Sequence, residues 1–150
     1  AEALGRQGLV LAVAGAADPA VFRAGGGVAA DAARVLGRVS DAELRALYEN
    51  ALCLVFPSRY EGFGLPPLEA MVCGCPVVAA RAGAVPEVCG DAALWFDPGE
   101  PATLRDALLR LVTEDGLREG LRAAGSARAP MFTWEKAARE LLAQVRERIA

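Results

Sequence analysis

The chain has 150 residues, the size of about one domain. With 54% hydrophobic residues and a formal net charge of −3, it can bury a core but does not attract a nucleic-acid backbone electrostatically. It contains no histidine, which excludes Ser-His-Asp triads and histidine-liganded zinc built from this chain. We therefore expect a single domain over residues 1–150, without nucleic acid as a partner.

The cysteines and the apolar runs bear on the cellular compartment. No C-x-x-C pair occurs, which favours reduced core cysteines of a cytoplasmic protein over zinc ligands, a redox pair or a disulfide framework. The longest clean apolar run, Leu9–Ala17, is too short for the roughly 18–20 residues that cross a bilayer, and we recognise no secretory leader. We expect no membrane span and a cytoplasmic location, with peripheral attachment to the inner face of the membrane left open.

Two short apolar runs near the start of the chain predict buried strands. They cover residues 9–14, which are followed by Gly15, and residues 34–39. Between them, residues 18–31 contain three consecutive glycines and no strong periodicity, and we interpret them as a loop or a poor helix. A capping box formed by Ser40 and Glu43 then predicts a helix. Its apolar face consists of Leu44, Leu47, Tyr48 and Ala51.

Strands and helices alternate along the rest of the chain. Further strands are predicted at 52–56, 76–80 and 93–96, the first of them central in a parallel sheet, with a short turn or helix at 85–90. Helices are predicted from Pro101, around 117–121 and after a Thr133 cap. The last helix carries an apolar stripe of Trp134, Ala138, Leu141, Val145 and Ile149. This alternation predicts an α/β fold, a parallel sheet covered by helices.

The residues that are candidates for binding or catalysis follow the strand at 52–56. Gly62 and Gly64 free the backbone there, and Pro66 and Pro67 suit the first turn of a helix that starts near Leu65. The free N–H groups and the positive end of such a helix can receive an anion. Open α/β sheets also bind ligands at the carboxyl ends of their strands. The segment is therefore predicted to be a phosphate-binding loop, a phosphate cradle of free amides at a helix end, able to hold a diphosphate without a metal.

Two glutamates accompany this cradle. Glu69 is expected on or beside the core-facing stripe formed by Leu65, Leu68 and Val72, and Glu61 lies at the mouth of the loop. An ionised carboxylate only accepts hydrogen bonds, so each glutamate suits the paired hydroxyls of a ribose or a hexose. The structural alternative for each is a turn or cap residue, satisfied by neighbouring backbone or by an arginine.

The stretch from Val55 to Val78 resembles the signature of family 4, or group 1, glycosyltransferases, and Glu61 and Glu69 match the E-x7-E motif of that family. The resemblance extends from about Leu9 to the end of the chain, and it includes residues 37–44, 85–93 and 132–134. It implies a Rossmann-like parallel sheet with helices on both faces. This sheet would form the carboxyl-terminal, nucleotide-sugar-binding half of a two-domain GT-B enzyme, whose amino-terminal acceptor half is absent.

The resemblance also implies roles for individual residues. Glu61 would be the catalytic residue that binds the donor-sugar hydroxyls, Glu69 would hold the ribose diol, and Arg38 and Val39 would lie against the base. Sugar and diphosphate oxygens would be reached by the backbone amides of Gly62, Phe63, Gly64 and Leu65. Family members retain the anomeric configuration and need no bound metal or other cofactor. The implied activity is transfer of a hexose from a nucleoside-diphosphate sugar to an acceptor that the sequence does not identify.

One departure from the family pattern concerns the leaving diphosphate. The family usually supplies an arginine and a lysine upstream of the strand that ends at Gly15, where this chain has only Arg6. We therefore expect a hexosyltransferase domain that is inactive by itself. A non-catalytic nucleotide-sugar-binding or scaffolding module is the alternative, and a nucleotide-sugar epimerase on a related fold is a more distant one.

Aromatic and basic residues outside the motif give weaker indications of a functional role. Arg59, Tyr60 and Arg81 flank the loop and are candidates to approach the donor or the acceptor. Trp95 and Trp134 are interpreted as packing residues rather than as platforms for a sugar ring.

Overall fold

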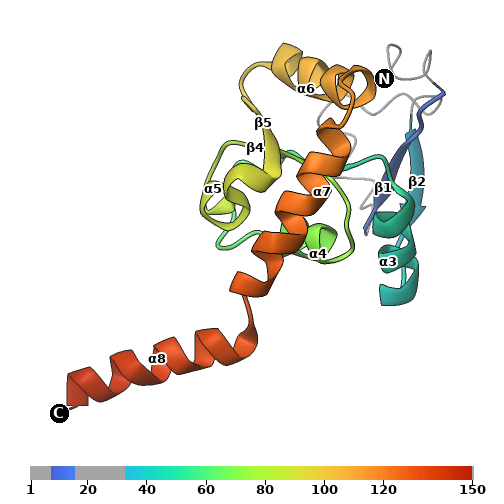
Figure 1. Cartoon of the computed structure of the whole chain (residues 1–150). Helices are drawn as coiled ribbons and strands as arrows, with labels where there is room; N and C mark the ends of the chain where they lie inside the picture. Colours follow the sequence, from blue (N-terminus) through green and yellow to red (C-terminus); the bar gives the residue numbers. More distant parts are fainter. Residues whose placement is uncertain (1–7, 16–32, 150) are drawn as a thin grey trace. The chain divides into compact units, whose positions relative to one another are not determined.

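The computed structural model describes residues 8–15 and 33–149 (Figure 1). The chain divides into two compact units, Ala1–Leu47 and Tyr48–Ala150, and each is described by itself. The glycine-rich segment 18–31 and Arg6 lie outside the described residues. The expectation of a single domain over residues 1–150 stays a prediction.

The first unit contains a two-stranded parallel sheet. Strand β1 (Leu11–Ala14) pairs with β2 (Ala33–Gly37), and the register shifts after Val13. Both predicted strands are present, but most of their residues are exposed, so the expectation that they are buried is wrong for the described structure. An apolar run indicates a strand but does not specify what covers its faces. Strand β2 also ends at Gly37, two residues earlier than expected. The reason is the positive φ of 68° at Gly37, which turns the backbone out of the extended conformation.

Helix α3 (Asp41–Asn50) begins at the predicted capping box. The Ser40 amide donates to Oε2 of Glu43 at 2.8 Å, and the Glu43 amide donates back to Oγ of Ser40 at 3.4 Å. Tyr48, on the predicted apolar face, is the buried residue of this helix. The reciprocal bonds satisfy two amides that the first turn would leave without partners, so the helix starts where the sequence indicates.

The second unit is built on a three-stranded parallel sheet in the order β3 (Leu54–Phe56), β4 (Val77–Ala80) and β5 (Ala93–Phe96). Every residue of β4 is buried, whereas every residue of β3 is half-buried. The expectation that the strand at 52–56 is central is therefore wrong for this sheet, in which β4 is central. A continuous apolar run marks a buried strand but does not encode its place among its neighbours.

Helices accompany these strands in the alternation that the sequence predicted, and the fold is α/β. Helix α4 packs against β3 and β4, and α6 packs against β4 and β5; in Figure 1 the strands β4 and β5 lie between the two helices. The helical elements are α4 (Leu65–Val72), α5 (Val85–Cys89), the 3-10 turn η1 (Gly90–Ala92), α6 (Pro101–Thr113), α7 (Leu117–Arg128), the 3-10 turn η2 (Ala129–Met131) and α8 (Trp134–Ile149).

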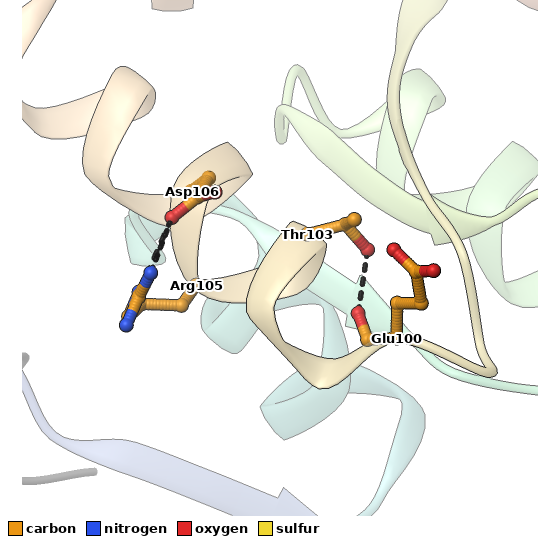
Figure 2. Close-up of polar contacts among 4 residues, drawn as sticks. All are labelled: Glu100, Thr103, Arg105 and Asp106. Carbon is orange, nitrogen blue, oxygen red and sulfur yellow. Dashed lines mark hydrogen bonds and ion pairs between the residues drawn. The ribbon is translucent and has the colours of Figure 1, made fainter.

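The start of α6 shows how local chemistry fixes a helix end. Pro101 is in its first turn, as predicted, and the Thr103 hydroxyl donates to the Glu100 carbonyl at 2.7 Å (Figure 2). Figure 2 also shows the exposed ion pair of Arg105 with Asp106, at 3.1 Å. Because both of these side chains are largely in solvent, the pair adds little to stability.

The core of the second unit lies where α4 packs against α7 on one side and against β3 and β4 on the other. Met71 of α4 is 1% exposed, and a Cβ at position 125 of α7 would lie 3.1 Å from its Cγ. Gly125 therefore lets the two helices approach closely. Leu111 of α6 is also 1% exposed and belongs to this core.

Helix α8 is present and is capped as predicted, with the Lys136 amide donating to Oγ1 of Thr133 at 3.2 Å. None of its residues is buried, however, and Trp134 is 82% exposed. Figure 1 shows α8 leading away from α7. The interpretation of Trp134 as a packing residue is therefore wrong for the described structure, whereas Trp95 is half-buried at the end of β5. An amphipathic pattern specifies a helix and its apolar face but not the surface that covers that face.

All four cysteines are free thiols; Cys75 and Cys89 are buried, whereas Cys53 and Cys73 are half-buried. Burial raises the pKa of Cys53 to about 12 and the pKa of Cys75 and Cys89 to about 11. A thiol with a raised pKa holds little thiolate at neutral pH, so these three side chains behave as small apolar residues.

Candidate functional site

The candidate site is the loop between β3 and α4, which follows the carboxyl end of β3. Helix α4 starts at Leu65, as predicted, after Gly64 with a φ of 100°, and prolines occupy its first turn. Within the described part of the chain, no hydrogen bond is donated by the amides of Gly62, Phe63, Gly64 and Leu65. Four N–H groups are therefore available at this helix end, as an anion site requires, and the binding of a phosphate there stays a prediction.

Contacts from other elements surround this loop. A Cβ on Gly83 would lie 3.1 Å from the Glu61 amide nitrogen and 3.2 Å from its carbonyl oxygen, so only a glycine lets the loop after β4 approach so closely. Gly83 also has a φ of 57°, which favours glycine. The ring of Phe63 lies edge-on to Phe132, with centroids 5.7 Å apart and planes at 81°. Sequence patterns marked neither Gly83 nor the ring contact.

The two glutamates of the motif lie in the same unit and differ in exposure. Glu61 is half-buried, and its carboxylate makes no hydrogen bond or ion pair within the described residues. Glu69 is exposed, which corrects the expectation that it lies on or beside the core-facing stripe. Val72, assigned to that same stripe, is 70% exposed.

The buried face of α4 consists of Pro67, Ala70 and Met71. The helix is short and mostly apolar, so more than one face could have been buried. Close packing against α7 selects the face with the small Ala70 and the flexible Met71. Glu69 is left at the surface as a consequence, where a ligand can reach its carboxylate.

Tyr48 is a partner of Glu69 that sequence reasoning missed, because its place on the apolar face of α3 indicated packing alone. Its side chain is 8% exposed. Burial raises the pKa of Tyr48 to about 12, and the nearby Glu69 carboxylate adds to this shift by its charge and by accepting a hydrogen bond from the neutral phenol. Tyr48 therefore lies near the Glu69 carboxylate, and Glu69 itself is exposed to solvent.

The basic and aromatic residues that flank the loop differ in their contacts. Nη2 of Arg59 donates to the carbonyl of Pro98 at 2.8 Å, and the Arg81 guanidinium lies 5.9 Å from the centroid of the Trp95 ring. Arg81, Trp95 and Pro98 also line an open cavity of about 450 Å³ at the carboxyl ends of β4 and β5. Tyr60 is 89% exposed. A role for these residues toward donor or acceptor stays a prediction.

Arg38 and Val39 follow β2 in the first unit. Arg38 is exposed and Val39 is half-buried. Their predicted position beside the base stays a prediction, because the two units are described separately.

Within residues 8–15 and 33–149, no group of three or more Cys, Asp or Glu side chains is placed to hold a metal ion. No helix in this part of the chain is both long and apolar enough to cross a membrane.

Comparisons with known proteins show the family and the fold. Residues 6–128 match the family model described as glycosyl transferases group 1. The chain is 47% identical over 102 residues to the O-antigen chain mannosyltransferase B of Escherichia coli, a match that covers 68% of this chain and 27% of that protein. It is 38% identical over 120 residues to the D-inositol 3-phosphate glycosyltransferase of Thermobifida fusca (strain YX), covering 79% of this chain and 28% of the relative.

Solved structures show the same fold. Sucrose-phosphate synthase from Thermosynechococcus elongatus superposes with a TM-score of 0.70 at 28% identity, over 80% of this chain and 31% of that one. The Anabaena protein HepE, solved in complex with UDP-glucose, superposes with a TM-score of 0.73 at 20% identity, over 92% of this chain and 40% of that one. The chain thus spans well under half the length of each protein named here.

Proposed function

This chain belongs to the group 1 glycosyltransferases, and we propose that within this family it is the donor-binding domain of a retaining hexosyltransferase. It would bind a nucleoside-diphosphate sugar from which a hexose is moved to an acceptor. The observation that carries the proposal is the set of available amides at the start of α4, with Glu61 and Glu69 in the same loop and helix.

The diphosphate is assigned to the loop amides. Gly62, Phe63, Gly64 and Leu65 offer N–H groups with no other acceptor among the described residues, at the positive end of α4. Donors fixed in this way stabilise the negative charge that develops on a leaving diphosphate. We propose that these amides, rather than a bound metal or another cofactor, receive it.

The two carboxylates are assigned to the two sugars of the donor. Glu69 is exposed and lies near Tyr48, which suits a carboxylate that accepts hydrogen bonds from the two hydroxyls of a ribose. Glu61 is half-buried beside the loop amides, which suits the catalytic position against the hydroxyls of the transferred hexose. Arg38 and Val39 are assigned to the base.

Similarity to characterised relatives supports the sugar class. The Escherichia coli relative is named a mannosyltransferase, and mannose is a hexose. Retention of the anomeric configuration rests on the family resemblance carried by the E-x7-E motif. Because the matched part is about a quarter of that relative, the proposal includes an amino-terminal acceptor-binding domain, without which this domain would not turn over. A cytoplasmic location, free or peripheral to the inner face of the membrane, is supported by the four free thiols.

Titration of the complete protein with UDP, GDP and ADP tests the proposal. At least one nucleoside diphosphate should bind, and Glu69→Ala should weaken its binding by about 1.5–3 kcal/mol, the contribution of a hydrogen bond to a charged group. Glu119→Ala, which removes an exposed glutamate of α7, is the matched control and should bind like the wild type. Unchanged affinity in folded Glu69→Ala would remove the ribose role.

Turnover distinguishes the enzyme from a binding or scaffolding module. The complete protein should release nucleoside diphosphate from a nucleotide sugar in the presence of an acceptor, and Glu61→Ala should abolish this release while the protein still binds nucleoside diphosphate. Binding without any release, across a panel of hexose donors and acceptors, would favour the non-catalytic module.

A further inference from the structure

The loop that would receive the diphosphate has few internal restraints. Phe63 lies between Gly62 and Gly64, the residues with the least restricted backbone, and the amides of this segment make no hydrogen bond within the described part of the chain. These amides must stay free if they are to bind a ligand. A side-chain contact is therefore needed to fix the segment between the two glycines, and Phe63 is the side chain that lies there.

The ring of Phe63 packs against the ring of Phe132, which lies between η2 and α8. The two rings pack edge to face at 5.7 Å, a geometry that aromatic pairs prefer. Phe63 is 40% exposed and Phe132 is half-buried, so the contact is at the rim of the unit rather than in its core. Removing it would therefore loosen the loop more than it would weaken the core.

Phe132 is itself held by Arg128, at the end of α7. The Arg128 guanidinium lies 5.6 Å from the centroid of the Phe132 ring. The same guanidinium donates to the carbonyls of Glu87 and Val88 in the last turn of α5. A Cβ on Gly90 would lie 2.8 Å from Cζ of Arg128, so a glycine leaves the room that the arginine occupies. The contacts thus run from α5 through Arg128 and Phe132 to the loop.

We propose that Phe132 is a positioning residue for the donor site: its ring holds Phe63 so that the loop amides face the diphosphate. This inference rests on the proposed function. Phe132 does not need to touch the ligand. Because α8 begins at Trp134, two residues further on, the start of α8 is tied to the geometry of the donor loop.

Donor affinity in the complete protein tests this role. Phe132→Ala should raise the Kd for the nucleoside diphosphate about three- to tenfold. This range corresponds to the interaction free energy of an aromatic pair. Phe132→Tyr, which keeps an aromatic edge, should restore most of the affinity. Met131→Ala removes an exposed side chain from the neighbouring turn and should leave Kd unchanged. The KM for the acceptor should be unchanged in all three variants.

A double-mutant cycle separates positioning from general loss of structure. If Phe132 acts through Phe63, then Phe132→Ala should change Kd in the wild-type background but hardly at all in Phe63→Ala. Equal effects in the two backgrounds, or an unchanged Kd in folded Phe132→Ala, would overturn the inference. Circular dichroism checks folding, and Phe132→Leu takes the place of Phe132→Ala in the cycle if the alanine variant does not fold. If the wild type binds no nucleoside diphosphate, the proposed function itself fails.

Discussion

At the scale of single residues, the pair formed by Tyr48 and Glu69 shows how one side chain can serve both packing and a binding site. Tyr48 is the buried residue of α3, and its phenol lies near the Glu69 carboxylate on α4. A phenol that is buried beside a carboxylate stays neutral, because its anion would be both poorly solvated and repelled. The neutral phenol remains a hydrogen-bond donor next to the Glu69 carboxylate at neutral pH.

The raised pKa of Tyr48 predicts a specific loss of stability at high pH. The phenol ionises near pH 10 in the unfolded chain but near pH 12 in the folded one, so its contribution to stability is complete below pH 10 and is lost as the pH rises toward 12. Thermal unfolding of Tyr48→Phe should lack this part of the pH dependence. Tyr60→Phe, which alters an 89% exposed ring, should follow the wild type. Superimposable pH profiles for Tyr48→Phe and the wild type would contradict the raised pKa.

At the scale of elements, the unit formed by β3, the loop and α4 depends on a left-handed residue at the helix start. Gly64 has a φ of 100° and a ψ of 52°, and the chain turns from the loop into the helix there. The turn leaves the preceding amides free and brings Pro66 and Pro67 into the first turn, where no N–H is needed. The free amides at the start of α4 are therefore a consequence of local backbone geometry.

Substitution of the two loop glycines by alanine tests this dependence. Gly64→Ala should lower the free energy of unfolding by about 1–2 kcal/mol, because a Cβ is strained in the left-handed region. A clash does not contribute, since the added Cβ would lie 3.5 Å from Cγ2 of Val85, an ordinary contact. Gly62→Ala is the matched control, with no positive φ and nothing within 4 Å of its Cβ. Chemical denaturation measures both variants, and an equal loss in both would contradict the strain argument.

At the scale of the whole molecule, helix α8 differs from every other described helix of the second unit, because no part of it is buried. Its apolar side chains include Leu141 and Val145, which are 63% and 46% exposed. The hydrophobic contribution of such side chains requires a covering surface, and the second unit does not supply one. The stability of this chain by itself should therefore come from the core around β4, α4, α6 and α7.

Two leucine variants of the 150-residue chain compare α8 with that core. Leu141→Ala should change the free energy of unfolding by no more than about 0.5 kcal/mol, as for other surface substitutions. Leu111→Ala should cost about 2–5 kcal/mol, because Leu111 is 1% exposed and its loss leaves a cavity. Urea denaturation measures both. A loss in Leu141→Ala as large as in Leu111→Ala would mean that α8 is packed in solution.

Features that depend on neighbours along the chain could be predicted from the sequence. Ser40 and Glu43 cap α3, Gly64 and the prolines start α4, and the apolar runs become β3, β4 and β5, because each depends on a few consecutive residues. The spacing of Glu61 and Glu69 is equally local, and it identified the family that the comparisons show.

Other features were decided only by tertiary structure. The sequence did not indicate that Ala70 and Met71 rather than Leu65 and Val72 would be buried, or that β4 rather than β3 would be central. Nor did it indicate that Tyr48 reaches Glu69 or that Phe132 meets Phe63. Each of these outcomes depends on surfaces that are distant in the chain and meet only on folding. Local propensity determines where elements form, whereas packing between them determines which faces are buried and which side chains meet.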